Sequence, residues 1–471
     1  MNAADCFFRA AVVLGIATGL SMATSAFAIQ RADDGKGQYL IVPVAIATDE
    51  YETLIEVSEL ERPGGGIRAL KLRVLDRDGV PRQAANLYPE RRGTWAAVLS
   101  RADGVARLKG DWSGCTLVEG PDGMEAVDEI SLDFEFGSLE IVDMGRLGEP
   151  LLPPPHEAPD CDALIDLWDA PADDHDDSLR PPVGHLAARA RIVNVSRGTL
   201  YEVPVTALKD FSDIPQHEPP GSALPDLAST HDAGTPDGQT RSVVCLADQC
   251  IEDFWADPID AASAALMVHD VRDTYEIDPA MNARSEWVVT YPTMAYYPED
   301  HQFAEMNTGL LVTDRTGRSF LSSVMPPPAF PTPYFSGSTA WLHHTRSVNL
   351  VDLSKTKDDV GELQSSSLFG IEHQVQVPGS LEYVQLDERL PDAGLVRLGF
   401  EWRHRPGGGL EYLEPLVANS GRAYLGRPAI VTTFMEYTNG TLPSDDGVSQ
   451  RANYGTAGTP QVHRRVNEPG D

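Results

Sequence analysis

Alternation of hydrophobic and polar residues constrains this chain more than any other feature of its sequence. Leu70, Leu72 and Val74 alternate with Lys71 and Arg73, and Ile, Leu and Phe residues alternate with polar ones in the same way over residues 130–136. Successive side chains of a strand point to opposite faces, so each run predicts a strand with one buried and one solvent-exposed face. This pattern is typical of antiparallel sheets that cover a core on one side.

Further strands are predicted through most of the chain, separated by turn sequences such as Asp78-Gly79 and Pro121-Asp122-Gly123. Short strands at regular spacing favour sandwiches or barrels. We therefore predict a mainly β protein with antiparallel β-sandwich-like domains. The further strands are expected at 38–46, 53–57, 94–99, 105–108, 139–142, 188–195, 200–205, 286–290, 309–313, 348–353, 369–377, 381–386, 395–402 and 429–437.

One prominent helix is predicted over residues 258–270. Asp257 is a natural N-cap, Pro258 suits the first helical position, and the alanine-rich stretch 261–268 favours helix. A shorter helix is expected over residues 162–168, with Asp160 as its cap.

Composition changes divide the chain into four expected segments. Residues 1–28 form a signal peptide, 29–145 a first β-sandwich-like domain, 146–184 an acidic, proline-rich connector, and 185–471 a second β-rich domain with a helix and long loops. The alternative is that residues 185–206 complete the first sheet. The acidic run 173–177 lacks the spacing, glycine and closing glutamate of a calcium loop, so we interpret it as part of the connector.

The N-terminus has the features of a secretory signal peptide. Arg9 precedes an apolar stretch over residues 10–20, and Ala26 and Ala28 complete an A-x-A cleavage pattern. A membrane anchor is the alternative, but the apolar stretch is short for a span. No later stretch approaches spanning length, so we expect an exported protein that is periplasmic, cell-surface or secreted, without a transmembrane segment after cleavage.

Four cysteines follow the expected cleavage site: Cys115, Cys161, Cys245 and Cys250. An even number of cysteines in an exported chain favours disulfides. Three pairings are possible, and we prefer the pairing of sequence neighbours, Cys115 with Cys161 and Cys245 with Cys250. A zinc site of four thiolates is the alternative, but the paired C-x-x-C spacing that it needs is missing.

The net charge of −34 argues against nucleic acid and anionic lipid as partners. The simplest interpretation is a solvated acidic surface. The partner therefore stays unknown at this stage, with a ligand at the cell surface or outside the cell as one option.

Motifs for familiar chemistries are missing or out of context. The sequence contains neither a G-x-S-x-G nucleophile elbow, a phosphate-binding glycine loop nor an H-E-x-x-H pair. An S-x-x-K match at 354–357 follows, instead of preceding, an S-x-N match at 347–349. We therefore predict no catalytic, cofactor-binding or metal-ligating residues, and no cofactor.

Two weaker alternatives remain among the histidines and aromatic residues. A metal site would need the fold to bring His301 to the adjacent histidines at 343 and 344. Aromatic side chains in proline-rich loops could stack on sugars, although packing is the commoner use of such residues; they are Tyr296, Tyr297, Tyr334, Phe335 and Trp341.

A series of short phrases, taken in order, resembles a family of uncharacterised exported proteins from proteobacteria. The resemblance spans nearly the whole chain after the signal peptide and implies export and one shared architecture, but no activity. This chain has Met294 where family members often have a basic residue. The phrases are GQYLIVP at 37–43, ETLI at 52–55, SGCT at 113–116, LEIVDMG at 139–145, IVNV at 192–195, GTLY at 198–201, PGS at 220–222, WVVTYPT at 287–293, GRP at 426–428 and ANYG at 452–455.

The sequence alone leaves the function open between two classes. We expect a non-catalytic exported surface or periplasmic protein that binds a ligand or has a structural role. The alternative is an exported carbohydrate-active or other hydrolase with an acidic site that the sequence does not reveal. A cleft that holds two acids about 5–10 Å apart, flanked by aromatic residues, would favour the enzyme.

Overall fold

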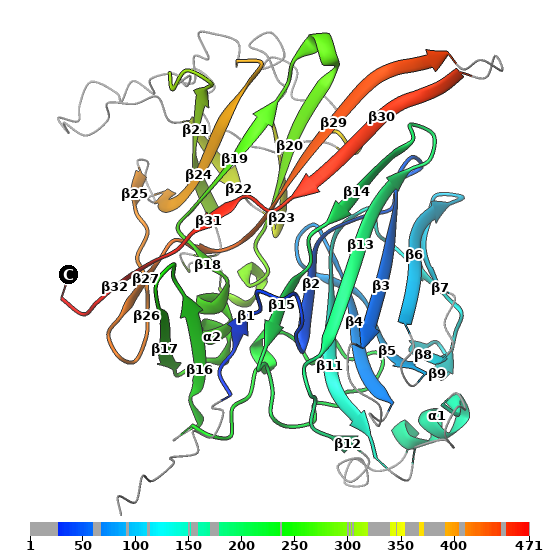
Figure 1. Ribbon diagram of the computed structural model, residues 1–471. Coiled ribbons are helices and arrows are strands. Elements are labelled where there is room, and N and C mark those ends of the chain that lie inside the picture. The colour runs from blue at the N-terminus through cyan, green and yellow to red at the C-terminus, as the bar shows by residue number, and fades with distance from the viewer. Residues whose placement is uncertain are drawn as a thin grey trace, which may run out of the picture.

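The computed structural model describes residues 27–59, 67–90, 94–110, 114–148, 151, 159–169, 179–235, 238–298, 301, 303, 306–318, 340–344, 346–353, 367–371, 391–404, 410–443 and 449–470. Within these residues the fold is mainly β, as predicted, and all pairings between the named strands are antiparallel. Figure 1 shows two layered β-regions, one built from the blue to green strands and the other from the green to red strands.

The first sandwich consists of a nine-stranded and a six-stranded sheet. Leu70 and Leu72 of the larger sheet pack with Ile55 and Val57 of the smaller one in a shared core. The larger sheet has the order β1 (Gln30–Arg31), β15 (Thr206–Lys209), β2 (Tyr39–Ile46), β11 (Phe136–Leu147), β4 (Arg68–Asp76), β5 (Pro81–Pro89), β8 (Gly114–Gly120) and β9 (Gly123–Ala126), with β12 (Leu179–Arg180) beside β11. The smaller sheet has the order β10 (Glu129–Leu132), β7 (Val105–Gly110), β6 (Thr94–Ala102), β3 (Glu52–Glu59), β13 (Leu186–Asn194) and β14 (Thr199–Val203).

Strands β13, β14 and β15 belong to this first sandwich. Strand β13 pairs with β3, β14 pairs with β13, and β15 pairs with β2. The second domain drawn from residue 185 therefore begins too early, and the alternative in which residues 185–206 complete the first sheet is correct. The connector before them also joins the sheet, through the pairing of β12 with β11.

The second β-region contains a six-stranded and a four-stranded sheet. Trp287 and Val289 of the smaller sheet share a core with Val396 and Leu398 of the larger one. The larger sheet has the order β22 (Ala340–His344), β21 (Met306–Asp314), β24 (Ala393–His404), β19 (Asp270–Glu276) and β31 (Gln461–His463), with β25 (Leu410–Tyr412) beside β24; the smaller has β23 (Val348–Asp352), β20 (Ala283–Thr290), β29 (Ile430–Pro443) and β30 (Ser449–Gly458).

Small elements complete the second region. They are the hairpin β16 (Thr240–Cys245) and β17 (Cys250–Trp255), the pair β18 (Met267–Val268) and β28 (Arg427–Pro428), and the strands β26 (Leu416–Val417), β27 (Ala423–Leu425) and β32 (Arg465–Asn467). Three 3₁₀ turns accompany them: η4 (Leu227–Ser229), η6 (Pro279–Met281) and η7 (Met294–Tyr296).

The two β-regions are joined by a continuous hydrophobic core as well as by hydrogen bonds. Val288 and Phe434 of the second region belong to the core cluster of the first sandwich. Across the junction, Thr290 Oγ1 donates to the Pro43 carbonyl over 2.7 Å and Tyr201 Oη donates to Glu436 over 2.6 Å. The molecule is thus more unified than a pair of separate domains.

Helix α2 (Pro258–Leu266) confirms the predicted N-terminus but not the predicted end. The side chain of Asp257 accepts a hydrogen bond from the Ile259 amide, as an N-cap should. The predicted end at residue 270 is wrong, because Met267 is already extended and Met267–Val268 pair with β28. Helix α1 (Cys161–Asp169) is equally long and confirms the shorter prediction, with Asp160 accepting from Asp162 N at 3.1 Å.

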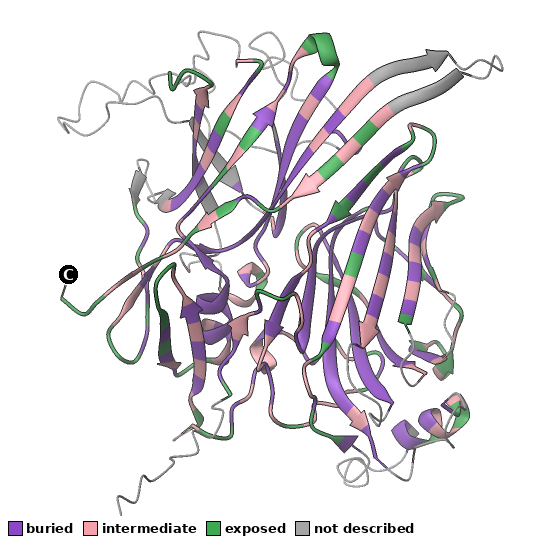
Figure 2. Ribbon diagram, viewed as in Figure 1, coloured by how far each residue is buried: buried purple, intermediate pink, exposed green. Residues whose placement is uncertain are grey.

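The expectation of a solvent-exposed face on strand β4 is wrong. Every residue of β4 is buried, including Lys71 and Arg73. Figure 2 shows β2, β4 and β11 in purple along nearly all their length, whereas β3 and β6 alternate. The central strands of the larger sheet are covered on both faces, because the segment after β15 lies on the outer side, where Lys71 Nζ donates to the Pro219 carbonyl at 2.6 Å.

Two predicted strands fall wholly or mostly outside the described residues. Phe369, where the predicted strand 369–377 begins, lies in a turn, and residues 372–377 and 381–386 are not described. The other predicted strands are present, but the run at 130–136 is interrupted at residues 133–135, and β11 and β29 extend five and six residues beyond their predicted ends. The hairpin of β16 and β17 was not predicted at all.

Candidate functional site

A cleft of about 1050 Å³, which we call the terminal cleft, lies among the described residues. It has three walls: the N-terminal segment with Arg31, the β16–β17 hairpin with its turn, and residues 460–464. Val205 and Thr206 complete the lining. In Figure 1 the blue β1 lies beside α2, and the red β31 lies above α2 in this view.

The N-terminal wall is held in place by backbone hydrogen bonds. Ile29 N donates to the Arg241 carbonyl at 3.0 Å, and Val243 N donates back to the Ile29 carbonyl at 2.9 Å. Arg31 pairs with Leu208 of β15. These bonds fix Arg31 between the first sandwich and the hairpin, with its side chain in the lining of the cleft.

The hairpin wall is closed by the disulfide of Cys245 and Cys250. The two cysteines are direct cross-strand partners with Cα atoms 3.9 Å apart. Beyond them the turn is exposed, and Leu246 N donates to the Gln249 carbonyl at 2.7 Å. At the other end Trp255 is buried and donates from Nε1 to Ser242 Oγ at 2.8 Å, so the hairpin is fixed at both ends.

The third wall is strand β31, which is the edge strand beside β19. Its residues Gln461, Val462 and His463 pair with β19, and His269 N donates to the His463 carbonyl at 2.9 Å. Arg464 follows directly and donates from Nη2 to the Ala265 carbonyl near the end of α2, at 3.3 Å. This strand therefore carries Arg464 into the cleft opposite the N-terminal segment.

Arg31 and Arg464 place two partly buried positive charges in the terminal cleft. Burial lowers the pKa of Arg31, and the charge of Asp33 opposes this only in part. Burial and then the positive charge of Arg31 lower the pKa of Arg464 to about 10. Both guanidinium groups stay charged at neutral pH, so two like charges share a partly dehydrated space.

The acids of the terminal cleft lie at its exposed rim. Asp33 and Asp248 line the cleft and are exposed to solvent, whereas Arg31 and Arg464 are partly buried. Neither acid forms an ion pair with either arginine among the described residues. Exposed carboxylates act weakly through water, so the interior of the cleft keeps a positive character in a protein with a net charge of −34.

A charged cluster beside the cleft supports strand β31. Asp270 is buried and receives hydrogen bonds from Arg272 at 2.9 Å and His269 at 3.2 Å, while His463 Nδ1 lies 3.5 Å away. Burial opposes ionisation of Asp270, but hydrogen bonds from His269 and Arg397 hold its pKa well below the usual range. The cluster is internally paired and serves to anchor the wall.

A smaller cavity of about 220 Å³ lies over the outer face of the larger N-terminal sheet and includes Arg73 and Tyr296. Arg73 Nη1 donates to the carboxylate of Glu140, which also accepts from Tyr39 Oη at 2.6 Å. Burial by itself lowers the pKa of Arg73, but the negative charge of Glu140 and the nearby Tyr39 hydroxyl raise it above its ordinary value. The positive charge at this cavity is thus matched inside the protein.

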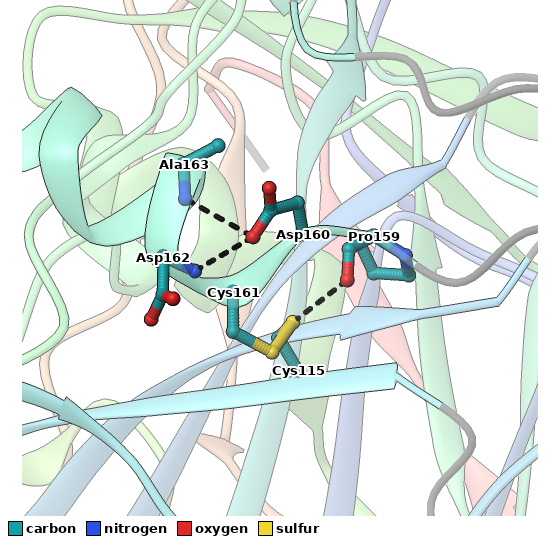
Figure 3. Close-up of a disulfide and its surroundings, with 6 residues drawn as sticks. All are labelled: Cys115, Pro159, Asp160, Cys161, Asp162 and Ala163. Carbon is teal, nitrogen blue, oxygen red and sulfur yellow. Dashed lines mark hydrogen bonds between the residues drawn. A yellow bond between two sulfur atoms is a disulfide. The ribbon is translucent and has the colours of Figure 1, made fainter.

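The structure contains both disulfides of the preferred pairing. Cys115 joins Cys161 at the start of α1, and Figure 3 shows the bridge beside the Asp160 cap. The Pro159 carbonyl lies 3.3 Å from Cys115 Sγ, a close contact only, because a disulfide sulfur carries no proton to donate. This bridge ties the helix to strand β8 of the first sandwich.

The histidines and tyrosines singled out in the sequence have packing roles where they are described. His344 is buried and its Nε2 lies 2.8 Å from Thr308 Oγ1, while His301 stacks on Tyr297 with ring centroids 4.3 Å apart. Tyr297 hydrogen-bonds Ser263 at 2.8 Å, and Tyr296 Oη accepts from Arg73 at 3.3 Å. Among the described residues no group of three or more His, Cys, Asp or Glu side chains could hold a metal ion.

Other predicted candidates lie outside the described residues or are in structural use. The S-x-x-K match at 354–357 and the side chains of Tyr334, Phe335 and Trp341 are not described. Ser347 of the S-x-N match is buried and donates to the Asp78 carbonyl at 3.1 Å.

No protein-family model, curated protein or solved structure matches this chain. None of the helices in the described part of the chain is long and apolar enough to cross a membrane. Sequence reasoning missed Arg31 and Arg464, because neither stands in a motif. The one available clue was that both are basic residues in a strongly acidic chain.

Proposed function

We propose that this protein is an exported, non-catalytic binding protein and that the terminal cleft is its ligand site. The observation that carries the proposal is the cleft itself, with about 1050 Å³ of space and uncompensated donors inside. Ligand sites of proteins are concave, mostly preformed, and contain a few polar groups that fix orientation.

Rigid walls support binding at this place. Two walls are strands with backbone pairing, and the third is a hairpin closed by the Cys245–Cys250 disulfide. A preformed site loses little conformational entropy when a ligand binds, which favours affinity. Disulfides are also the cross-links that exported proteins use, in keeping with the secretory signal peptide at residues 1–28.

The composition of the cleft favours binding over hydrolysis. Its acids, Asp33 and Asp248, are exposed, and none of its lining residues is Phe, Tyr or Trp. A glycosidase needs two carboxylates beside the scissile bond, one of them shielded from water so that it can act as an acid.

A second cavity offers a place for the hydrolase alternative. A cavity of about 310 Å³ is lined by three acids, Asp49, Glu50 and Glu135, together with Phe369. These carboxylates are exposed, and Arg101 in the same cavity donates to the backbone carbonyls of Ala47, Gly104 and Phe134. The shielding that a general acid needs is missing here, so we rank this alternative second.

A blocking substitution tests the proposed site. Ala247 is exposed in the hairpin turn and lines the cleft, so Ala247→Trp should fill the mouth without disturbing the core. Val195 is 79% exposed elsewhere, which makes Val195→Trp a matched control. The wild type and both variants would be incubated with a periplasmic small-molecule extract, desalted, and analysed by native mass spectrometry.

We expect the wild type and Val195→Trp to retain a small molecule that Ala247→Trp does not retain, and we expect the molecule to be released unchanged. Retention by all three proteins would place the site elsewhere. Release of a cleaved molecule would make the protein an enzyme. If none of the proteins retained a small molecule, the proposed function would be wrong.

A further inference from the structure

We propose that the terminal cleft recognises an organic anion, and that Arg31 and Arg464 together hold its carboxylate or phosphate group. This inference rests on the proposed function, since it names the class of ligand for the same site. It follows from the open donors of the two arginines, the position of the nearby acids and the apolar patch beside them.

The open donors are the first argument. The Arg31 side chain has no hydrogen-bond acceptor among the described residues, and Arg464 gives one N–H to the Ala265 carbonyl. A guanidinium group carries five N–H donors in a planar fork. The remaining donors face the cleft and not a protein acceptor, and an oxyanion between the two forks would accept charge-assisted hydrogen bonds from them.

The second argument comes from the like charges themselves. Arg31 and Arg464 reach the same cleft from opposite ends of the chain, and the positive charge of Arg31 disfavours the charged form of Arg464. Two of the fully buried arginines elsewhere are paired with acids, Arg73 with Glu140 and Arg68 with Asp143. An anion from outside would supply the missing countercharge in the cleft.

The third argument concerns the rest of the ligand. Val205, Val243 and Val462 line the cleft beside the arginines and are partly exposed. The volume of about 1050 Å³ is far larger than an inorganic anion needs. The ligand that fits is therefore an organic molecule with an anionic head and a partly apolar body.

A structural role for Arg464 is the competing explanation. Its bond to the Ala265 carbonyl helps to satisfy the C-terminal end of α2, which is a common use of arginine. Arg31 makes no such bond, so it separates the two explanations. If Arg31 serves the fold, its removal lowers stability; if it serves a ligand, its removal lowers affinity alone.

Titration calorimetry at low ionic strength with three probes of one chain length tests the inference. Hexanoate and hexyl phosphate carry the two candidate head groups, and hexan-1-ol is their neutral counterpart. The proteins are the wild type, Arg31→Gln, Arg464→Gln and the control Arg465→Gln. Arg465 is the neighbour of Arg464 but is exposed, and among the described residues its side chain bonds only Asn467, at 3.4 Å. Its substitution therefore changes the net charge equally but outside the cleft.

We expect at least one anion to bind the wild type, and hexan-1-ol to bind at least about tenfold more weakly. Arg31→Gln and Arg464→Gln should weaken anion binding by about ten- to a hundredfold, as expected when charged hydrogen bonds are lost, while Arg465→Gln should not. The melting temperature of Arg31→Gln without ligand should equal or exceed that of the wild type. The better of the two anions identifies the head group.

Three results would overturn the inference. In the first, hexan-1-ol binds as tightly as the anions, and Ala247→Trp abolishes all binding. That result would keep the cleft as a ligand site but would reject recognition of a negatively charged group. A lower melting temperature of Arg31→Gln with unchanged affinity would make the arginine structural. Failure of the wild type to bind either anion at millimolar concentration would reject anion recognition, while the extract experiment with Ala247→Trp would still decide the proposed function separately.

Discussion

Arg73 in the first sandwich and Arg31 in the terminal cleft are both withdrawn from bulk water, but only Arg73 has a countercharge within hydrogen-bonding distance. Arg73 lies under the covered face of the larger sheet and donates to Glu140 and Tyr39. Arg31 faces open space, with Asp33 at the rim as the acid whose charge acts on it. The difference suggests that matched charge marks structure in this protein, and unmatched charge marks a place for a ligand.

The two regions also use their disulfides differently. Cys115 and Cys161 are 46 residues apart in sequence and join helix α1 to the first sandwich. Cys245 and Cys250 are five residues apart and close a single turn at the cleft. The first bridge restrains a long stretch of the unfolded chain, whereas the second shapes one wall of a site.

Removing the countercharge of Arg73 should have the largest effect on stability. Glu140→Gln leaves a buried guanidinium group without its anion, which typically costs about 3–5 kcal/mol of unfolding free energy. Urea unfolding followed by tryptophan fluorescence measures the loss. The control is Glu202→Gln at an exposed position of β14, where we expect a change within about 0.5 kcal/mol. A loss below about 1 kcal/mol for Glu140→Gln would mean that the pair is not what compensates Arg73.

Removing the disulfides should sharpen the contrast between the two regions. Loop-closure entropy predicts a loss of about 4 kcal/mol for Cys115→Ala with Cys161→Ala, and about 2 kcal/mol for Cys245→Ala with Cys250→Ala. Denaturant unfolding of both double variants tests the order of the two effects. Ligand retention should fall only in the Cys245→Ala, Cys250→Ala variant. A fall in the Cys115→Ala, Cys161→Ala variant would contradict the assignment of a purely structural role to the first disulfide.

The pH dependence of stability should be smaller and should come from the cluster that anchors β31. Hydrogen bonds from His269 to Asp270 and Glu401 raise the pKa of His269 to about 9. A histidine whose pKa is raised on folding stabilises the protein fully below about pH 6.5. That stability is lost as the pH rises through about 9, and we expect about 1–2 kcal/mol after allowing for solvent screening.

Urea unfolding of the wild type and His269→Gln at pH 6 and pH 9.5 measures this contribution of His269 to the free energy of unfolding. The wild type should lose more stability than the variant between the two pH values. Equal losses would mean that the pairing of His269 contributes nothing to the wall of the cleft.

Much of the fold could be predicted from the sequence because its strands follow local patterns. The alternation around Ile130 and Leu132 is seen in the burial of β10, and Asp257 and Pro258 start α2 where expected. Lys71 and Arg73 were expected in solvent and are buried, because the cover over their face comes from distant residues near Pro219 and Tyr296. A local sequence pattern gives no information about distant residues that pack over a strand.

The candidate site was less predictable for the same reason. The disulfide of the hairpin was predicted, because an even number of cysteines in a chain expected to be exported favours bridges, and Cys245 lines the cleft. Arg31 and Arg464 meet only through the pairing of β1 with β15 and of β31 with β19. Neither pairing has a motif, and each depends on the complete arrangement of sheets.

The cleft draws its two arginines from residues 31 and 464, which makes it a product of very long-range contacts. Such contacts form late, because the entropy of closing a long loop must be overcome before they become favourable. During synthesis, the pocket therefore lacks its complete recognition surface until strand β31 has paired with β19. Ligand binding would then report on completed maturation of the chain as well as on the presence of the ligand.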